Sequence, residues 1–385
     1  MSVKPLRVCY FGTYRANYAR NQIMMEGLRR NGVEVVECHE SLWHGVEDRV
    51  RTASGGWRRP GFWWRVARTY TKLLWKYRQI GEYDMMVVGY PGQIDVFLGR
   101  VLTWLRGRPL VWDVFMSIYL IALERNLDAK SRFTLQSLRQ LERSALRLPD
   151  MLIQDTVQYV NWFHDIHGVD AKRFKLVPTG ADDRIFYSLP SDARDDGIFR
   201  VIYYGTFIPN HGVEHIMEAA RLLADEINIQ FEMVGNGPEQ IKARSLADEH
   251  GLRNVTFIEW LEKPQLIRRV AQADVCLGAF GITPQSLMTV QNKIYEGLAM
   301  GKPVITGDSP AVRQTLQHGE HVYLCERADG GALAEAIRTL LDDPGLQARL
   351  AENGYRIFKE QFDLQHNGAR YAGHLRELVG TRGDS

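Results

Sequence analysis

Short apolar runs alternate with stretches of helical periodicity along almost the whole chain, and this alternation limits the folds that the chain can adopt. The runs lie at 6–11, 33–38, 85–88, 109–113, 151–155 and 174–177, and again at 201–204, 229–234, 255–258, 275–279, 303–306 and 322–325. Continuous apolar strands are typical of parallel sheets covered on both faces. Helices between consecutive strands favour doubly wound units. We therefore predict an α/β fold.

The polar stretch 188–199 interrupts this rhythm between the two series of strands, and we expect it to be a linker. It separates a first domain at 1–187 from a second at 200–345, and the segment from 331 to about 379 is predicted to be helical throughout. A chain of 385 residues with 45% hydrophobic and 24% charged residues can form two such domains, and this composition excludes a disordered or fibrous chain. No apolar run approaches the ~20 residues of a membrane span.

The two halves carry opposite net charges. Residues 1–190 contain 28 Lys and Arg against 19 Asp and Glu, whereas residues 191–385 contain 20 against 27. A basic half suits an anionic partner, which leaves a membrane surface, a phosphate-bearing acceptor and nucleic acid open. The four cysteines form no CxxC pair, and the N-terminus leads directly into a strand without a signal peptide. Both features predict a cytoplasmic protein.

Ligands of open α/β sheets bind beyond the carboxyl ends of the strands, so we searched the loops that follow each strand. In the second half, one glycine-containing loop spans 204–212 and another spans 234–238. Glycine lets the backbone approach a ligand closely, and a following helix N-terminus favours phosphate. The candidates in these loops are Gly205, Thr206, His211, Gly235, Asn236 and Gly237. Taken singly, each loop is also consistent with an ordinary tight turn.

A third loop begins at Gly281 and leads into the segment 291–304. Within it, Lys293 and Glu296 are three residues apart, so they share one face at the start of a predicted helix. A lysine can neutralise a diphosphate, and a glutamate can accept two hydrogen bonds from ribose hydroxyls. The alternative is an exposed ion pair on the helix surface.

These segments resemble a known family. The stretches YYGTF, FEMVGNGPE, NVTFIEWL, ADVCLGAF and NKIYEGLAMGKPVITGDSP match, in order and spacing, the C-terminal domain of glycosyltransferase family 4 over roughly residues 200–345. The first half is similar more loosely, through RVCYFGTY, LERSALRLPDMLIQDT and KLVPTGADDRIF. The resemblance implies the GT-B fold, which has two tandem doubly wound Rossmann-like domains with an interdomain cleft. It also implies terminal helices, from 346 to 385, that cross back to the first domain.

The same resemblance implies a hexosyl-type transferase that takes a sugar from a nucleotide-sugar donor, with retention, and needs no metal or other cofactor. Glu296 matches the second glutamate of the family's E-x7-E motif, which holds the donor ribose, whereas the first glutamate position is Met288. The family often has Arg and Lys at the positions of Thr206 and His211, where they grip the diphosphate. We expect Lys293 to stabilise the departing diphosphate instead. Backbone and side-chain groups expected to assist it come from Thr289, Val290 and Asn292.

In the first half, Gly12 and Thr13 follow the first strand, and Arg20 opens the next helix. By resemblance, Gly12 faces the donor, whereas Thr13, Arg20 and Asp155 are candidates for binding the acceptor. Asp113 ends another strand and is a catalytic candidate; its neighbour is Trp112, where many relatives have a histidine. The alternative for Arg20 is a solvated arginine in the first helical turn.

Segment 51–80 holds eight basic residues, no acidic one and four of the nine tryptophans. Five of its side chains are predicted to share one helical face: Trp63, Val66, Tyr70, Leu73 and Tyr77. A basic helix with Trp and Tyr is typical of binding to an anionic bilayer surface, which would place the protein on the cytoplasmic face of a membrane. The alternative is that this face packs on the sheet and the charges are solvated. No nucleic-acid motif is recognised, and no nucleic-acid partner is expected.

Other function classes remain to be weighed. The run His211-Gly-Val-Glu214-His215 has the H-x-x-E-H pattern of some zinc peptidases, but Gly212 interrupts it at a strand-to-helix loop. We therefore expect no metal site. The favoured function is transfer of a sugar to a lipid-linked or glycan acceptor. The alternatives are a sugar-nucleotide epimerase of the same fold and a non-catalytic sugar-binding or scaffold subunit of a polysaccharide assembly complex.

Overall fold

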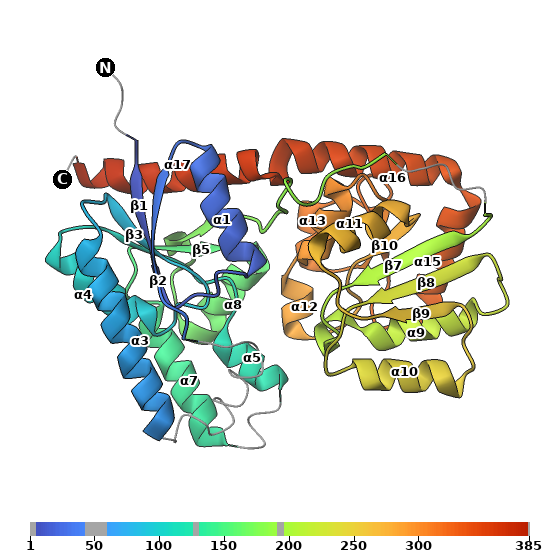
Figure 1. Ribbon diagram of the computed structural model, residues 1–385, viewed down its shortest axis with the longest axis horizontal. Coiled ribbons are helices and arrows are strands. Elements are labelled where there is room, and N and C mark those ends of the chain that lie inside the picture. Colours follow the sequence, from blue (N-terminus) through green and yellow to red (C-terminus); the bar gives the residue numbers. More distant parts are fainter. Residues whose placement is uncertain (1–4, 43–59, 126–130, 191–195, 384–385) are drawn as a thin grey trace. The chain divides into compact units, whose positions relative to one another are not determined.

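The computed structural model describes residues 5–42, 60–125, 131–190 and 196–383. By its internal contacts the chain divides into two compact units (Figure 1). The first comprises Met1–Pro178 together with Leu364–Ser385, and the second comprises Thr179–Asp363. The second unit therefore begins before the polar stretch 188–199. The chain returns to the first unit at Leu364.

The first unit is built on one parallel sheet whose strands lie in the order β2-β1-β3-β4-β5-β6. Its elements are β1 (Arg7–Gly12), α1 (Ala19–Arg30), β2 (Glu34–His39), α3 (Pro60–Gln79), β3 (Met85–Val88), α4 (Asp95–Leu105), β4 (Leu110–Asp113), α5 (Ile118–Glu124), α7 (Arg132–Ala145), β5 (Met151–Gln154), α8 (Val157–His167), η2 (Ala171–Arg173), β6 (Phe174–Leu176) and α17 (Leu364–Gly383). Successive strands pair in parallel, for example β1 with both β2 and β3. All six strands predicted for this half are present.

The second unit repeats the design with the strand order β12-β11-β10-β7-β8-β9. Its elements are β7 (Phe199–Tyr204), η3 (Pro209–His211), α9 (Val213–Leu222), β8 (Ile229–Val234), α10 (Gln240–Glu249), β9 (Val255–Ile258), α11 (Lys263–Gln272), β10 (Val275–Leu277), α12 (Pro284–Met288), α13 (Asn292–Ala299), β11 (Val304–Gly307), α14 (Pro310–Thr315), β12 (Tyr323–Cys325), α15 (Gly330–Asp342), α16 (Pro344–Ile357) and η4 (Phe358–Phe362). The six strands predicted for the second half are likewise present.

Both faces of the second sheet are covered by helices. Along β7, Val201 and Tyr203 belong to one buried cluster, whereas Ile202 and Tyr204 belong to the other. Helices α9 and α15 contribute to the first cluster, and α11 and α13 contribute to the second. Because successive side chains of a strand point to opposite faces, a sheet covered on both sides needs apolar residues at every position. This explains why the strands appear in the sequence as continuous apolar runs.

The segment predicted to be helical from 331 to about 379 consists of separate helices. Helix α15 ends at Asp342, and α16 starts with Pro344, which has no N–H to donate to a preceding turn. The Asp343 side chain accepts a hydrogen bond from Leu346 N (2.8 Å) and caps α16. A π-helical turn, η4, follows, and Asp363 separates it from α17. The segment is therefore helical as predicted except at the breaks around Asp343 and Asp363.

Helix α17 packs on α1, as Figure 1 shows within the first unit. Buried side chains of α17, such as Tyr371 and Leu375, join the core that surrounds β1. The α17 side chain of Asn367 also donates to Pro178 O (2.7 Å). The two helices come closest at Gly27 and Gly368, where a Cβ built on Gly368 would lie 2.0 Å from Gly27 O. Only glycine fits at this crossing.

Among the described residues, no helix combines the length and apolar character that crossing a membrane requires. All four cysteines are buried and carry free thiols.

The crossing of α1 and α17 generates a stability prediction. We expect Gly368→Ala to lower the free energy of unfolding by about 2 kcal/mol or more, because the added methyl group overlaps backbone atoms that cannot move aside cheaply. Gly373→Ala on the same helix is the matched control, since a Cβ there meets no atom within 4 Å. The control is expected to be neutral or slightly stabilising. Urea unfolding of both variants measures the difference, and equal stability of the two would contradict the close packing.

Candidate functional site

The strand order of the second sheet locates its ligand-binding position. The order reverses between β7, the first strand of this unit, and its neighbour β10. In open α/β sheets, ligands bind beyond the carboxyl ends of the strands at such a reversal. The segments that follow β7 and β10 are 205–212 and 278–291, and both hold residues singled out from the sequence.

Glycines let the loops after β7 and β8 pack backbone against backbone. Gly205, Gly235 and Gly237 have φ angles of 137°, 122° and 153°, which side-chain-bearing residues rarely adopt. A Cβ on Gly235 would lie 2.1 Å from Gly205 O, and one on Gly237 would lie 2.6 Å from Phe207 N. The loops are joined by hydrogen bonds from Gly205 N to Val234 O (3.0 Å) and from Phe207 N to Asn236 O (2.9 Å). The three glycines therefore build one compact double loop at the strand ends.

Lys293 lies against this double loop. It is 6% exposed, and a Cβ on Gly205 would lie 3.2 Å from its Nζ. The Nζ atom also lies 3.2 Å from His211 Nδ1 and 4.0 Å from the centre of the Tyr203 ring. In turn, His211 Nδ1 is 2.8 Å from the Tyr203 hydroxyl and 2.7 Å from Thr206 O. The structure thus brings together Gly205, Thr206, His211 and Lys293, all four of which were predicted as site residues.

Burial governs the ionisation of these groups. It lowers the pKa of Lys293 from 10.5 to about 7, because no carboxylate is close enough to compensate fully for the lost hydration. Burial and the Lys293 charge also hold the pKa of His211 well below its ordinary value, so the imidazole is neutral at pH 7. Burial raises the pKa of Glu296 to about 7, although the Lys293 charge opposes this. The site therefore combines a lysine and a glutamate that both titrate near neutrality.

Helix α13 directs its N-terminus to the same place. The first N–H groups of a helix have no carbonyl partner inside the helix, and together with the helix dipole they favour an anion. At the N-cap position, Gln291 provides no side-chain hydrogen bond to this end. Instead its Nε2 donates to Thr289 Oγ1 (3.2 Å) and Ser286 O (3.3 Å). Thr289 and Val290 are both buried just before this helix start, and Asn292 is its first residue.

The remaining second-unit candidates are placed differently. The Thr206 and Asn236 side chains are exposed, and these residues contribute mainly backbone oxygens, to His211 and to Phe207 respectively. The histidines of the zinc-like motif do not converge. His211 contacts Lys293, whereas His215 faces Glu214 and Glu218 on α9. No cluster of His, Cys, Asp or Glu suited to a metal ion occurs within the described ranges.

In the first unit, the loop after β1 is held by a residue that the sequence did not single out. Gly12 has a φ of 133°, and a Cβ there would lie 2.6 Å from Asp95 Oδ2. The same carboxylate accepts hydrogen bonds from Thr13 N (2.7 Å) and from the Tyr70 hydroxyl (2.7 Å). Asp95 is 2% exposed and opens α4, and burial raises its pKa. The available sequence signal was its place in the loop that follows β3.

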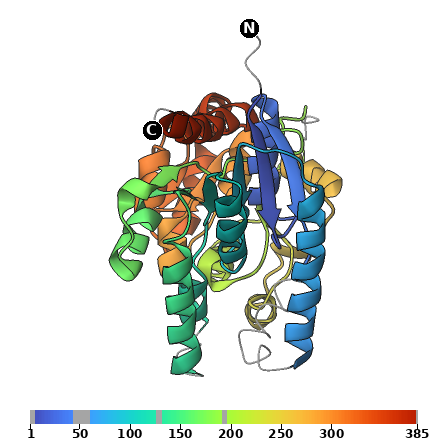
Figure 2. The same cartoon turned by 90° about the vertical axis from the view of Figure 1, so that its left-hand side faces the viewer.

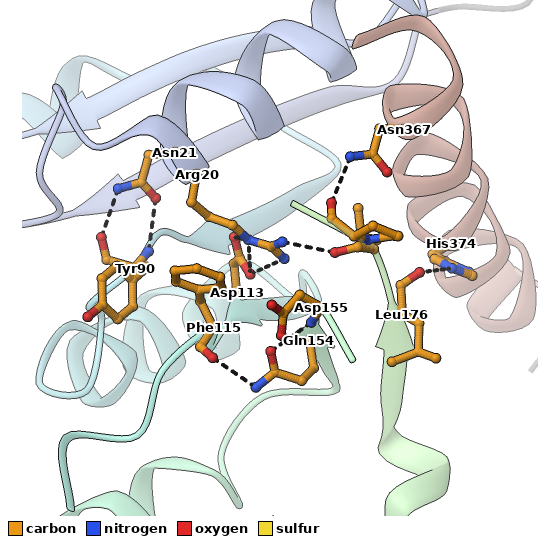
Figure 3. Close-up of polar contacts among 12 residues, drawn as sticks. Arg20, Asn21, Tyr90, Asp113, Phe115, Gln154, Asp155, Leu176, Asn367 and His374 are labelled. Atoms are coloured by element: carbon orange, nitrogen blue, oxygen red, sulfur yellow. Dashed lines mark hydrogen bonds and ion pairs between the residues drawn. The ribbon is translucent and has the colours of Figure 1, made fainter. Parts of the chain in front are cut away.

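Arg20 and Asp113 form a closed ion pair (Figure 3). Arg20 Nε and Nη2 both donate to the Asp113 carboxylate, with a shortest distance of 2.8 Å, and Nη1 donates to Val177 O (2.9 Å). Both side chains are 0% exposed, and the guanidinium stacks 5.0 Å from the Phe115 ring centre. Such a pair ties α1 to β4. In this state neither residue offers a free polar group to a substrate.

Asp155 lies beside this pair at the end of β5 (Figure 3). It is 7% exposed, and its Oδ1 has no hydrogen-bond partner among the described residues. Burial raises its pKa to about 7, although the Arg20 charge acts in the opposite direction. Gln154 positions it, since Gln154 Oε1 accepts from Asp155 N (2.7 Å) while Gln154 Nε2 donates to Phe115 O (3.0 Å). Of the first-unit candidates, Asp155 is the one that keeps an unpaired polar atom.

Helix α3 is light blue in Figures 1 and 2. Of the five side chains predicted to share one face, Leu73 and Tyr77 are buried, whereas Trp63 is 56% exposed. Only part of this face therefore packs against the rest of the unit. Trp64 and Trp75 are also exposed, at 72% and 62%. These two are about three helical turns apart, on the side opposite the buried residues. Residues 51–59 of the basic segment lie outside the described part of the chain.

The family-model match covers most of the second unit. Residues 190–357 match the family model of glycosyl transferases group 1. This group 1 region contains the double loop, Lys293, His211 and Glu296. Met288 and Thr206, where the sequence departs from the family 4 pattern, also lie inside it.

Curated relatives match over part of their length. The lipopolysaccharide core biosynthesis glycosyltransferase LpsD of Rhizobium meliloti (strain 1021) is 28% identical over 215 residues, which are 56% of this chain and 57% of LpsD. The alpha-D-kanosaminyltransferase of Streptomyces kanamyceticus is 27% identical over 179 residues, which are 46% of this chain and 45% of that enzyme. The matched part of the chain thus spans about half the length of these relatives.

Solved structures match almost the entire chain. Sucrose-phosphate synthase from Thermosynechococcus elongatus has a TM-score of 0.73 at 18% identity, covering 98% of this chain and 100% of that chain. Anabaena HepE in complex with UDP has a TM-score of 0.70 at 17% identity, covering 97% and 100%. These likenesses establish the fold: two doubly wound domains of the GT-B type, as the resemblance implied.

The electrostatics of Lys293 yield a pH prediction. Between pH 7 and 10.5 the folded chain binds fewer protons at Lys293 than the unfolded chain does, so the free energy of unfolding should rise with pH in this window. The gain is at most about 1.4 kcal/mol per pH unit. Lys293→Met should abolish this contribution, and urea unfolding at pH 7.5, 8.5 and 9.5 measures it. Lys242→Met, at an exposed lysine, should keep the wild-type slope. Equal slopes for wild type and Lys293→Met would refute the shifted pKa.

Proposed function

We propose that the chain is a glycosyltransferase that takes its sugar from a nucleotide diphosphate donor. The observation that carries this proposal is the position of Lys293. It stands in the first turn of α13, against the double loop, at the strand-order reversal of the group 1 region. A buried cation beside an uncapped helix N-terminus is suited to a diphosphate. Glu296, one turn further along α13, then accepts hydrogen bonds from the donor ribose.

A uridine diphosphate donor is the first to test. The solved HepE structures contain UDP, UDP with glucose, and UDP-glucose, and a Staphylococcus aureus TarM structure contains UDP. Those ligands belong to those proteins. We extend them to this chain because its fold is the same and because its double loop provides close backbone approach at the strand ends where ligands of such sheets bind.

In the proposed mechanism, charge develops on the diphosphate as the sugar–phosphate bond breaks. Lys293 Nζ and the first N–H groups of α13 stabilise that charge, and the neutral His211 imidazole keeps Lys293 in place without competing for the anion. The leaving phosphate accepts the proton of the attacking acceptor hydroxyl, and the anomeric configuration is retained. No metal is required, since fixed positive groups perform the neutralisation.

The acceptor is proposed to use the first unit. Asp155 offers an unpaired carboxylate oxygen for a sugar hydroxyl, whereas Thr13 is held by Asp95 beside Gly12. Arg20 and Asp113 support this edge from inside, since both are fully enclosed. The relatives whose printed names state an activity are transferases and synthases, which favours transfer over epimerisation or a scaffold role. A glycan or lipid-linked acceptor agrees with the lipopolysaccharide core biosynthesis named for LpsD and LpsE and with the capsular polysaccharide biosynthesis named for CapM of Staphylococcus aureus.

Nucleotide binding tests the donor site. At a ligand concentration of 100 times Kd, binding stabilises the folded state by about 2.7 kcal/mol, a rise of roughly 5 to 10 °C in Tm. We expect such a rise with one of UDP, GDP, ADP or CMP, and its loss in Glu296→Ala and Lys293→Ala. Glu335→Ala, at an exposed glutamate on α15, is the control and should respond like wild type. Folded protein that responds to none of the four would overturn the proposed function.

We further propose that α3 and α4 form a membrane-docking surface on the cytoplasmic side. The surface comprises Trp63, Trp64, Leu74 and Trp75 on α3 and Val101, Trp104 and Leu105 on α4. Trp64 and Trp104 are 72% and 76% exposed, and an exposed patch of large apolar side chains is typical of an interaction site. Five basic residues and no acidic one lie on α3, so the charge suits an anionic lipid headgroup. Two contacts hold the helices to the same unit. The Tyr70 hydroxyl of α3 donates to Asp95 of α4, and the Arg106 guanidinium, directly after α4, donates to Ile80 O and Gly81 O, just beyond α3.

Vesicle binding tests this surface. Wild-type protein should co-sediment with vesicles containing phosphatidylglycerol but not with pure phosphatidylcholine, and salt should weaken the binding. Arg68→Ala with Lys72→Ala should cost about 2 kcal/mol, roughly 30-fold in partitioning. Trp64→Ala with Trp75→Ala should likewise reduce binding, whereas Trp260→Ala, at a 60% exposed tryptophan of the second unit, should not. Equal binding by all variants would exclude α3 as the docking helix.

A further inference from the structure

Arg327 is a buried cation that neither the proposed mechanism nor the sequence patterns use. It stands two residues beyond the end of β12, is 8% exposed, and precedes Ala328, which has a φ of 56°. Its side chain lies over the last residue of β11, since a Cβ on Gly307 would be 2.5 Å from Arg327 Cγ. The missing side chain at Gly307 thus provides the space for the guanidinium. Arg327 reaches the carboxyl edge of the second sheet through this gap.

The guanidinium joins separate loops at that edge. Nε donates to Asp308 O (2.7 Å), and Nη1 donates both to Gly281 O (2.7 Å) and to Ser286 Oγ (2.9 Å). Burial lowers the pKa of Arg327 to about 10, so the group remains charged at neutral pH. Two of its acceptors belong to the segment 281–289, which precedes α13. The cation therefore anchors the segment from which the helix start at α13 emerges.

A chain of hydrogen bonds and close contacts connects Arg327 with Lys293. The Ser286 hydroxyl, which is 0% exposed, donates a hydrogen bond to Asn210 O (2.6 Å). Asn210 directly precedes His211, and His211 O accepts from Phe280 N (3.0 Å). The backbone is also in close contact here, because a Cβ on Gly281 would lie 2.3 Å from Pro209 O. Arg327 thus fixes the segment 281–289 against the loop that carries His211, the neighbour of Lys293.

We propose that Arg327 is a positioning residue for the donor site. It holds the segment 281–289 against the loop 205–212 and thereby places the start of α13, with Lys293, beside His211 and Gly205. This inference rests on the proposed function for the ligand, but the clamp itself is a property of the protein alone. Arg327 Nη2 has no partner among the described residues, and an unpaired buried donor is unfavourable for stability. An apolar residue that only filled this space would not leave a buried donor unpaired. The presence of arginine therefore favours a role in positioning the loops at the carboxyl edge of the second sheet.

Hydrogen exchange of the ligand-free protein tests the clamp. In Arg327→Met the amides of 205–212 and 280–291 should exchange at least about tenfold faster than in wild type, while those of β8 keep their protection. Arg327→Lys keeps the charge but can make fewer of the three bonds, and it should give an intermediate rate. Arg313→Met, at an exposed arginine of α14 paired with Asp308, is the control and should leave both loops unchanged. Unchanged exchange in folded Arg327→Met would overturn the clamp.

UDP binding by calorimetry on the same variants tests the role in the donor site. We expect Kd for UDP to rise at least about tenfold in Arg327→Met and less in Arg327→Lys, with Arg313→Met at the wild-type value. A merely structural role would lower Tm and leave Kd of the folded protein unchanged, and that result would overturn the positioning role. Wild-type protein that binds neither UDP nor the other nucleotides would instead overturn the proposed function, and the donor role of Arg327 with it, while hydrogen exchange still decides the clamp.

Discussion

The second unit is organised around a lysine that is buried without a dedicated counter-ion. Lys293 Nζ has the face of Tyr203 on one side, a neutral histidine on another and the bare backbone of Gly205 beside it. None of these neighbours neutralises it, so an anion entering the site finds a cation whose charge is not already satisfied. The glycine at position 205 follows from this constraint. Any side chain at Gly205 would occupy the space next to the ammonium group.

Both units have a positive-φ glycine at the end of their first strand, but the buried charged group beside that glycine has the opposite sign in the two units. A glycine with nearly the same φ lies at the carboxyl end of the first strand of each unit: Gly12, at 133°, is the last residue of β1, and Gly205, at 137°, directly follows β7. A Cβ at Gly12 would meet the Asp95 carboxylate, whereas one at Gly205 would meet the Lys293 ammonium. The Asp95 carboxylate is already bonded to Thr13 and Tyr70, so it holds its loop closed. The Lys293 ammonium is held only by weak neighbours. The turn at Gly12 is therefore held by hydrogen bonds to a carboxylate, whereas the turn at Gly205 keeps a cation beside it that can bind an anionic ligand.

The local sequence pattern predicted the strands of both sheets well, because a strand that is buried on both faces must be apolar throughout. The twelve strands of the described ranges lie where the apolar runs occur. The helical spacing of Lys293 and Glu296 likewise predicted a shared face. Contacts between distant parts of the chain were not predictable in this way. Nothing near Arg20 in sequence indicates that Asp113, 93 residues away, encloses it.

The same limit applies to the supporting residues that the sequence did not reveal. Asp95 binds a loop 82 residues before it, and Arg327 binds one 46 residues before it. The exposure of Trp63 also depends on what lies beside α3, since periodicity gives a helix its faces but does not say which face meets the sheet. Met288 and Thr206 remain departures from the family pattern for which the described contacts offer no account.

The membership of α17 in the first unit has a consequence for biosynthesis. The core around β1 needs Leu364, Tyr371 and Leu375, which are synthesised after the whole of the second unit. The second unit, Thr179–Asp363, is contiguous and can complete its own core earlier. Of the two units, the one whose synthesis starts earlier is thus the one that completes its core later. Until α17 is synthesised, the side of α1 around Gly27 lacks the helix that covers it in the folded unit.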